Sequence, residues 1–199
     1  MKLLYAPASP YSAKVRMAAA QAGVALDAVR VDTSSQPPEL VSVNPLGKIP
    51  CMVTDDGEPV YDSRGITQYL NRISGNALFP RNVGKRLEAE RLEALADGIC
   101  DCLLAHVYER RMRPAEKVHQ PWLDSQWSKV VRALDTINAA PPRLGKKPTA
   151  GHIALRAALG YLDLRFAGQW ERGRTRTKRW AARFDERFPE LKQYLPAQG

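Results

Sequence analysis

The stretch Ala8-Ser9-Pro10-Tyr11-Ser12-Ala13-Lys14-Val15 decides how the rest of this chain is interpreted. It follows a short apolar run, Lys2-Leu3-Leu4-Tyr5, that is typical of a β-strand. It opens a segment, Pro10–Ala22, in which apolar residues recur with helical spacing. The expected layout is a strand, a tight turn and a helix, with the Ser9 hydroxyl on the turn. The positive end of the helix dipole stabilises an anion at such a turn.

Serine at this position suggests a supporting role rather than nucleophilic attack. A hydroxyl with no base beside it is a poor nucleophile, but it can donate a hydrogen bond to the thiolate of another molecule. In thioredoxin-like folds the reactive group lies at this turn, and glutaredoxins carry Cys-Pro-Tyr-Cys where this chain has Ser9-Pro10-Tyr11-Ser12. The sulfur would then come from a bound thiol, for which glutathione is the first candidate.

Length and composition are those of an ordinary globular protein. A chain of 199 residues can form one large domain or two small ones with a substantial core. Three cysteines, an odd number, favour a reducing cytosol over a disulfide framework. The N-terminal apolar run is too short for a signal peptide, and no run approaches the length of a membrane span. We therefore expect a cytoplasmic protein that does not enter a membrane.

The formal net charge of +9 is unevenly distributed. Between Arg172 and Arg187 there are seven basic and two acidic residues, a net charge of +5, which leaves +4 for the rest of the chain. Such a segment is typical of a solvated helix face, and it is also compatible with a cationic patch for an anionic substrate or partner. Nucleic acid is not the partner we expect.

The first 75 residues predict the element order βαβαββα. A second strand over Leu26–Asp32 must be parallel to the first, because a helix connects them. Strands at Cys51–Thr54 and Pro59–Tyr61 flank Asp55-Asp56-Gly57, a strong hairpin signal. A further helix is expected to begin at Asp62-Ser63, with Ser63 as its N-cap.

After this unit the pattern is purely helical. Residues 76–83 contain Pro80 and no periodicity, and are expected to form a linker. Four helices follow: one over 84–113, one from Pro121, one from Thr149 that is apolar nearly all round, and a last one marked by Thr177–Phe188. The stripe expected to be buried on the first of these consists of Leu92, Leu95, Ile99, Leu103 and His106. The predicted fold class is α/β plus all-α, with a thioredoxin-like domain at 1–75, a linker at 76–83 and an all-helical domain at 84–199.

Taken together, several local motifs resemble the glutathione transferase superfamily across essentially the whole chain, most closely bacterial members of the serine or theta-like kind. One of these motifs alone would be a weak signal, whereas their joint spacing is specific. They are the Ser9–Val15 stretch, Asn44–Pro50, Asp62-Ser63, Leu78–Pro80, and Gly151–Leu155 running into Gly160–Asp163.

The resemblance implies a role for the loop before the third strand. The Ile49–Pro50 bond is expected to be cis, which exposes the backbone of Ile49. The N–H and C=O groups of Ile49 would then pair with the cysteinyl part of glutathione, as an added strand does. Lys48 would reach the glycyl carboxylate or the cysteinyl region.

The resemblance also implies roles for two helix N-termini. Asp62 would hold the γ-glutamyl ammonium group, while Ser63 and the helix end behind it would hold the γ-glutamyl carboxylate. Ser9 would donate its hydroxyl hydrogen to the glutathione sulfur, and no metal is expected. Capping by Ser63 and a rigid turn at Pro50 are the structural alternatives, and both are compatible with ligand binding.

Other side chains are alternative candidates for a functional role. Tyr5 is the alternative to Ser9, since some transferases use a tyrosine near the end of the first strand. Tyr11 and Cys51 are expected to be packed. His106 is expected to pack between helices, and the roles of His106 and Tyr108 stay open.

One position departs from the family pattern. Members often place Asp three residues after a helix-capping Ser or Thr, whereas Thr149 is followed by His152. Neutral imidazole can accept a backbone hydrogen bond and protonated imidazole cannot, so this cap is expected to weaken when His152 is protonated.

The expected function is a glutathione transferase, usually homodimeric, that attacks an electrophilic small molecule which the sequence does not identify. Conjugation, peroxide reduction and haloalkane substitution all stay open. The alternative is a non-catalytic binding protein on the same fold, like stringent starvation protein A, for which the basic C-terminal segment would suit. Thiol–disulfide chemistry would need a cysteine at position 9, where the chain has Ser9.

Overall fold

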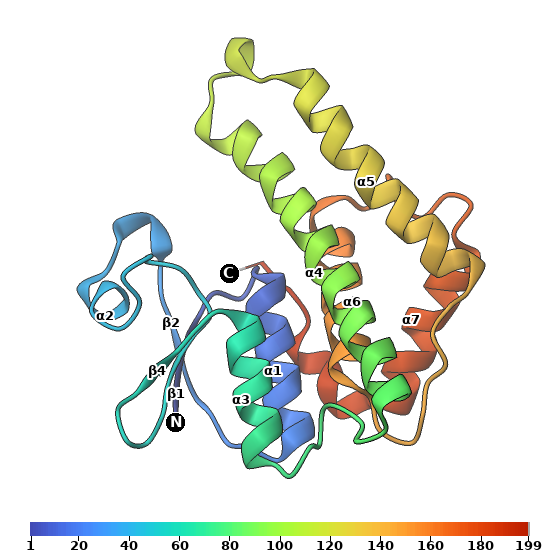
Figure 1. The fold of residues 1–199 in the computed structure, drawn as a ribbon. Helices are drawn as coiled ribbons and strands as arrows, with labels where there is room; N and C mark the ends of the chain where they lie inside the picture. Colours follow the sequence, from blue (N-terminus) through green and yellow to red (C-terminus); the bar gives the residue numbers. More distant parts are fainter. Residues whose placement is uncertain (199) are drawn as a thin grey trace.

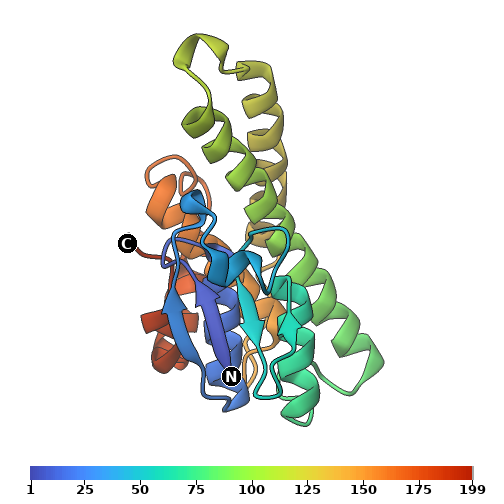
Figure 2. The same ribbon diagram turned by 90° about the vertical axis from the view of Figure 1, so that its left-hand side faces the viewer.

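The computed structural model describes residues 1–198 and arranges them in layers. A small sheet lies at one side, α1 (Pro10–Ala22) and α3 (Ser63–Ile73) cover one of its faces, and the helices from α4 (Val83–Met112) to α7 (Thr175–Arg187) lie beyond them (Figure 1). A view onto the sheet shows the strands in front and the hairpin of α4 and α5 (Gln120–Ala139) rising behind them (Figure 2). Within residues 1–198, no helix combines the length and apolarity that crossing a membrane requires.

The four strands are β1 Lys2–Tyr5, β2 Asp27–Arg30, β3 Cys51–Val53 and β4 Pro59–Val60. They form a mixed sheet with strand order β2-β1-β3-β4. The predicted parallel pairing of β1 with β2 and the predicted β3–β4 hairpin are present, and β1 also pairs antiparallel with β3, a pairing that the sequence pattern did not specify.

All three later strands are shorter than predicted. The expected strand over Leu26–Asp32 loses residues at both ends because its only neighbour, β1, offers four residues for pairing. Thr54 belongs to the hairpin turn, where its hydroxyl accepts a hydrogen bond from Glu58 N at 3.0 Å. A β-ladder ends where its partner ends, so the apolar pattern overestimates the strand lengths.

The helices of the N-terminal unit are α1 Pro10–Ala22, α2 Pro38–Val41 and α3 Ser63–Ile73. α1 begins and ends as predicted, with Gly23 in the left-handed region at φ +70°. The prediction that Ser63 caps α3 is wrong. Asp62 is the N-cap, its backbone is extended and its carboxylate accepts a hydrogen bond from Arg64 N at 2.9 Å, while Ser63 is the first helical residue.

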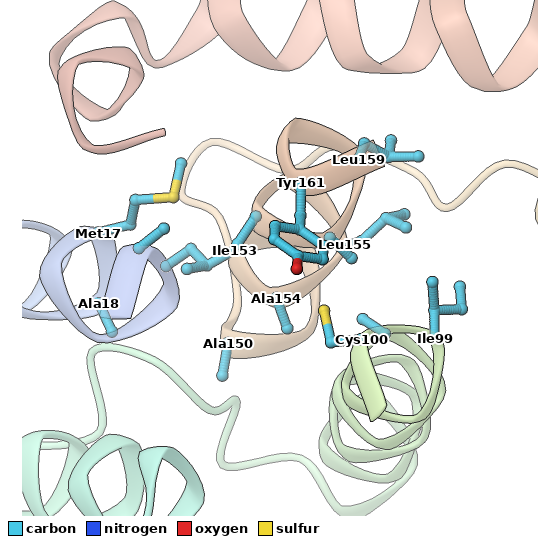
Figure 3. Close-up of a cluster of buried hydrophobic side chains, with 14 of the residues drawn as sticks. Met17, Ala18, Ile99, Cys100, Ala150, Ile153, Ala154, Leu155, Leu159 and Tyr161 are labelled. Carbon is cyan, nitrogen blue, oxygen red and sulfur yellow. The ribbon is translucent and has the colours of Figure 1, made fainter. Parts of the chain in front are cut away.

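The helical unit contains α4 Val83–Met112, α5 Gln120–Ala139, α6 Ala150–Arg165 and α7 Thr175–Arg187, with short 3-10 turns at Thr33–Ser35, Ala115–Lys117 and Pro189–Tyr194. Every residue of α6 from Ala150 to Leu162 is buried, which confirms the expectation for a helix that is apolar all round. Side chains of α1, such as Met17, and of α4, such as Ile99, surround it (Figure 3).

The buried face of α4 differs from the predicted stripe. Ile99 and Leu103 are buried as expected, but Leu92, Leu95 and His106 are only half-buried. The buried face instead includes small residues and two carboxylates, Glu93 and Asp97. The α4–α6 contact is close because Gly151 has no side chain: a Cβ there would lie 2.4 Å from the Ala89 carbonyl oxygen.

A single core cluster joins the sheet to the helical unit, running from Leu3 on β1 to Leu191 near the C-terminus. The predicted linker is held against this core. Asn71 Oδ1 accepts hydrogen bonds from Leu78 N and Phe79 N at 3.1 and 3.0 Å, and both of these apolar side chains are buried. The domain boundaries at 75 and 84 stay predictions.

The capping box at α6 uses a histidine as its second member. Thr149 Oγ1 accepts a hydrogen bond from His152 N at 3.4 Å, and His152 Nδ1 accepts one from Thr149 N at 3.1 Å. Burial lowers the pKa of His152 to about 4, although its hydrogen bond to the Arg143 backbone opposes that shift. The His152 imidazole is therefore neutral in the folded protein at neutral pH.

Because His152 must be neutral to cap α6, we predict that the protein loses stability in mild acid. Because the His152 pKa is lower in the folded than in the unfolded chain, its contribution is complete above pH 6.5 and is lost as the pH falls from about 6.5 toward about 4. Between pH 7.5 and 5.5 the loss is about 1.4 kcal/mol, a fall in Tm of about 3–6 °C. Thermal melts of wild type and His152→Asp at both pH values measure it.

The aspartate variant is the matched control, because a carboxylate at this position accepts the Thr149 N–H without titrating between these pH values. We expect a smaller pH response in His152→Asp than in wild type. Equal pH responses in the two proteins would contradict the proposed role of the imidazole.

Candidate functional site

Three segments singled out in the sequence meet at one end of the sheet. Leu4 pairs with Cys51 in the antiparallel β1–β3 ladder, so the chain leaves β1 beside the point where it enters β3. Met52 pairs with Val60, so the chain also leaves β4 at this end. The Ser9 turn, the Ile49–Pro50 loop and the Asp62-Ser63 helix start are therefore neighbours, although they are far apart in sequence.

Ser9 is the N-cap of α1. Its Oγ accepts a hydrogen bond from Ser12 N at 3.2 Å, and its side chain is partly exposed. A hydroxyl has one hydrogen to donate as well as lone pairs to accept with, so capping leaves the Ser9 hydrogen available to a ligand. Pro10 occupies the first turn as expected, where its missing N–H costs no hydrogen bond. The turn thus presents a hydrogen-bond donor at the positive end of a helix.

The loop before β3 is shaped by Asn44. Its buried side chain donates to Lys48 O at 2.7 Å and accepts from Leu46 N at 3.1 Å, which fixes the turn between them. The Ile49–Pro50 bond is cis, which confirms the prediction. Pro50 is buried, Ile49 is partly exposed and the Lys48 side chain reaches solvent.

The start of α3 supplies the third segment. Asp62 is exposed, and one carboxylate oxygen, Oδ1, accepts from Arg64 N. Its other carboxylate oxygen makes no hydrogen bond within residues 1–198. The Ser63 side chain is almost fully buried, and its carbonyl accepts from Thr67 Oγ1 at 2.7 Å. A carboxylate with a free oxygen lies next to a helix N-terminus, so the segment can bind both a cation and an anion.

Behind these segments lies a buried ion cluster that the sequence analysis missed. Lys14 on α1 is 1% exposed and Asp97 on α4 is 2% exposed. Lys14 Nζ donates to both Asp97 oxygens at 2.8 and 3.0 Å and to Glu93 Oε1 at 3.3 Å. Burial raises the pKa of Glu93, and repulsion from Asp97 adds to this, while the Lys14 charge opposes it. The cluster fastens α1 to α4.

The cluster continues to the edge of the candidate site through Arg64. Arg64 Nε donates to Asp97 Oδ2 at 3.0 Å, and its Nη2 lies 3.6 Å from Asp101 Oδ2. Tyr11 on α1 donates its hydroxyl to Asp101 as well. Burial and this hydrogen bond raise the pKa of Tyr11, so its phenol stays protonated. Tyr11 is thus not merely packed, as predicted, but bonded to α4.

A signal for this cluster was present in the sequence. Lys14 lies one turn after Tyr11 and one turn before Ala18, on the apolar face of its helix. A cation on an apolar face needs a buried anion as its partner. Glu93 and Asp97 follow one another at i, i+4 on a helix with apolar neighbours, and could have been identified as that partner.

The rival residues lie in other settings. The ring of Tyr5 is covered by the Arg16 guanidinium, whose centre is 4.6 Å from the ring centroid. His106 packs edge-on against Phe166 with ring centroids 5.4 Å apart, which supports the packing role considered for it. Burial raises the pKa of the Cys51 thiol to about 11 and raises that of Cys100 as well, so both are protonated at neutral pH.

Comparison with known families gives matches in both halves of the chain. Residues 8–73 match the model for the glutathione S-transferase N-terminal domain, and residues 120–195 match that for the glutathione S-transferase C-terminal domain. The chain is 31% identical over 169 residues to the uncharacterized GST-like protein YibF of Escherichia coli strain K12, covering 83% of each protein.

Solved structures show the same similarity. A glutathione S-transferase from Methylobacillus flagellatus KT with glutathione bound is 34% identical, with a TM-score of 0.89 over 98% of this chain and 99% of that one. A glutathione transferase family member from Pseudomonas fluorescens Pf-5 with bound glutathione is 35% identical, with a TM-score of 0.87 over 99% of each chain.

The buried ion cluster predicts a large cost for removing one partner. Asp97→Ala leaves the Lys14 ammonium buried without its main counter-charge, so we expect a loss of about 3–5 kcal/mol in the free energy of unfolding. The double variant Lys14→Met, Asp97→Leu removes the ammonium group together with its main counter-charge. It leaves Glu93, whose pKa burial already raises, and should lose less than Asp97→Ala. Urea unfolding measures all of these changes.

Glu90→Ala is the matched control on the same helix, since Glu90 forms an exposed ion pair with Arg86 at 2.7 Å. It should cost about 0.5 kcal/mol or less. If Asp97→Ala costs no more than Glu90→Ala, the cluster does not hold the two helices together.

Proposed function

The chain belongs to the glutathione S-transferase family, and from this premise we propose that it binds glutathione and activates the glutathione thiol for attack on an electrophilic small molecule. The observation that supports this most strongly is the environment of Ser9. Its hydroxyl accepts the Ser12 N–H and keeps its own hydrogen to donate, at the N-terminus of α1. A sulfur anion there would accept a hydrogen bond from the Ser9 hydroxyl and would be stabilised by the positive end of the α1 dipole.

The hydrogen bond from Ser9 and the α1 dipole can together supply the free energy that is needed to ionise the glutathione thiol. A free thiol has a pKa near 8.5, so about two units of lowering are needed to ionise most of it at neutral pH. That shift requires about 2.7 kcal/mol of preferential stabilisation of the anion. A hydrogen bond to a charged acceptor supplies about 1.5–3 kcal/mol and the helix N-terminus about 0.3–1 kcal/mol. Ser9 and α1 together can therefore keep glutathione as its thiolate.

The remaining contacts in our proposal hold the peptide in place. The backbone of Ile49, a partly exposed residue that precedes the cis bond to Pro50, would pair with the cysteinyl residue. Lys48 reaches solvent beside it and would bind a carboxylate or the cysteinyl region. Asp62 would use its free carboxylate oxygen for the γ-glutamyl ammonium group, and Ser63 with the α3 N-terminus would take the γ-glutamyl carboxylate.

Nucleophilic attack is made by the negatively charged sulfur of glutathione, held beside Ser9. The thiolate sulfur forms the new bond to the electrophilic carbon or other centre, and the electrophile's leaving group departs with the bonding electrons in a substitution. Ser9 keeps its proton throughout, because it donates a hydrogen bond rather than accepting one from the thiol. The proposal includes a small electrophilic substrate, a homodimeric assembly and a cytoplasmic location.

The proposal predicts the effect of removing the Ser9 hydroxyl. In Ser9→Ala the pKa of bound glutathione should rise by about 1–2 units, because one hydrogen bond to the anion is lost. Ser9→Thr keeps both the hydroxyl and the helix cap, and should retain most of the thiolate. The ultraviolet absorbance of the thiolate, followed across pH with glutathione saturating, gives the pKa in each protein.

Ser12→Ala is the matched control, because it removes a neighbouring hydroxyl that accepts from Ala6 N at 3.5 Å. We expect the pKa of bound glutathione to be unchanged in it. If Ser9→Ala and wild type give the same pKa, Ser9 does not activate the thiol, and a tyrosine such as Tyr5 becomes the candidate.

A further inference from the structure

An open groove of about 750 Å³ lies between α7 and the loop that joins α5 to α6. α7 lies on the side of the helical unit away from the sheet, so the groove is separate from the candidate glutathione site (Figure 1). Its apolar lining consists of Pro141, Pro142, Leu144 and Trp180. Its charged lining consists of Arg143, Arg176, Arg179, Arg183, Arg187 and Glu186.

The positive charge of this groove is uncompensated. Five arginines against one glutamate give a net charge of +4, and none of the five forms an ion pair within residues 1–198. The nearby acid Asp185 is occupied by Arg156 at 2.7 Å. Arg179, Arg183 and Arg187 follow at i, i+4 and i+8 on α7, a spacing that destabilises a helix through repulsion. An anionic ligand would relieve that repulsion.

The two walls of the groove are held together, so the arginines are presented on a fixed frame. Trp180 Nε1 donates to Pro142 O at 2.8 Å, and Arg176 Nη1 donates to Ala139 O at 2.6 Å. Asn138 of α5 reaches across to cap α7: its Oδ1 accepts from Arg176 N and Thr177 N at 3.0 and 3.1 Å. Little of the backbone has to move when a ligand binds, which favours affinity.

We propose that this groove binds a short chain of phosphates, such as inorganic polyphosphate or the phosphate tail of a nucleoside triphosphate. Guanidinium groups match phosphate oxygens in a bidentate geometry. From Arg176 to Arg187 the α7 face spans about 16 Å, at about 1.5 Å per residue, which several linked phosphates can occupy. A phosphate chain carries about one negative charge on each phosphate, at a closer spacing than the carboxylates of an acidic peptide, so it places more negative charge within that length against the net charge of +4.

The groove is not built to read a base. Trp180 is 4% exposed and its N–H already bonds Pro142 O, so its ring offers no stacking surface. Proteins that bind single-stranded nucleic acid rely on exposed aromatic rings for that purpose. Recognition here therefore depends on the phosphates themselves.

The test is calorimetric titration of the full chain, at low ionic strength, with sodium tripolyphosphate, ATP without metal, and a hexaglutamate peptide. Arg179→Glu, Arg183→Glu is the test variant, since both residues lie in the groove and neither is part of the glutathione site. Lys2→Glu, Arg72→Glu is the control, because it changes the net charge equally on exposed residues at the start of β1 and in the last turn of α3. Circular dichroism melts check that both variants are folded.

We expect wild type and the control to bind tripolyphosphate similarly, and the test variant to bind it at least about tenfold more weakly, with glutathione binding unchanged in all three. ATP binding no tighter than tripolyphosphate binding would show that the phosphate chain alone is recognised. Tighter ATP binding would contradict the conclusion that the groove does not read a base, and would assign a nucleotide as the source of the phosphates. Three results overturn the proposal: no saturable binding to wild type, equal weakening in both variants, or hexaglutamate binding as tight as tripolyphosphate.

Discussion

The ion pair between Lys14 and Asp97 is the contact on which the arrangement of this protein depends. It joins the helix that carries Ser9 to the longest helix of the C-terminal unit, and both side chains are almost fully buried. A buried ammonium group that lacks its carboxylate is strongly destabilising, so electrostatics contributes to the relative position of α1 and α4 together with apolar packing. Through Asp97 the same contact also positions Arg64, which directly follows the Asp62-Ser63 helix start.

The candidate site uses the electrostatics of helix ends in two different ways. At α1 the N-cap hydroxyl of Ser9 adds a donor to a helix N-terminus, which suits a sulfur anion. At α3 the N-cap is a carboxylate, Asp62, which places negative charge beside unpaired backbone N–H groups and suits a zwitterion such as an α-amino acid end. The sheet register brings both helix ends and the cis Ile49–Pro50 bond to one place.

Features set by local sequence were predictable, whereas features set by distant partners were not. The Ser9 turn, the hairpin around Asp55-Asp56-Gly57 and the burial of α6 follow from residues adjacent in sequence, and the structure confirms them. The strand ends depend on the length of a neighbour, and the buried face of α4 depends on Lys14, about eighty residues away. The cap of α3 was misassigned because Asp62 and Ser63 are both good N-caps, and only the backbone geometry decides between them. The binding roles of Ser9, Lys48, Ile49, Pro50, Asp62 and Ser63 stay predictions.

The most direct test of the central claim is calorimetric titration of glutathione into the wild-type protein. Calorimetry is preferable to tryptophan fluorescence, because Trp122, Trp127, Trp170 and Trp180 all lie in the helical unit, far along the chain from the candidate site. Our account predicts saturable binding of one glutathione per chain, weakened in Asp62→Ala. No binding at millimolar glutathione would contradict it, and would favour a non-catalytic binding protein on the same fold.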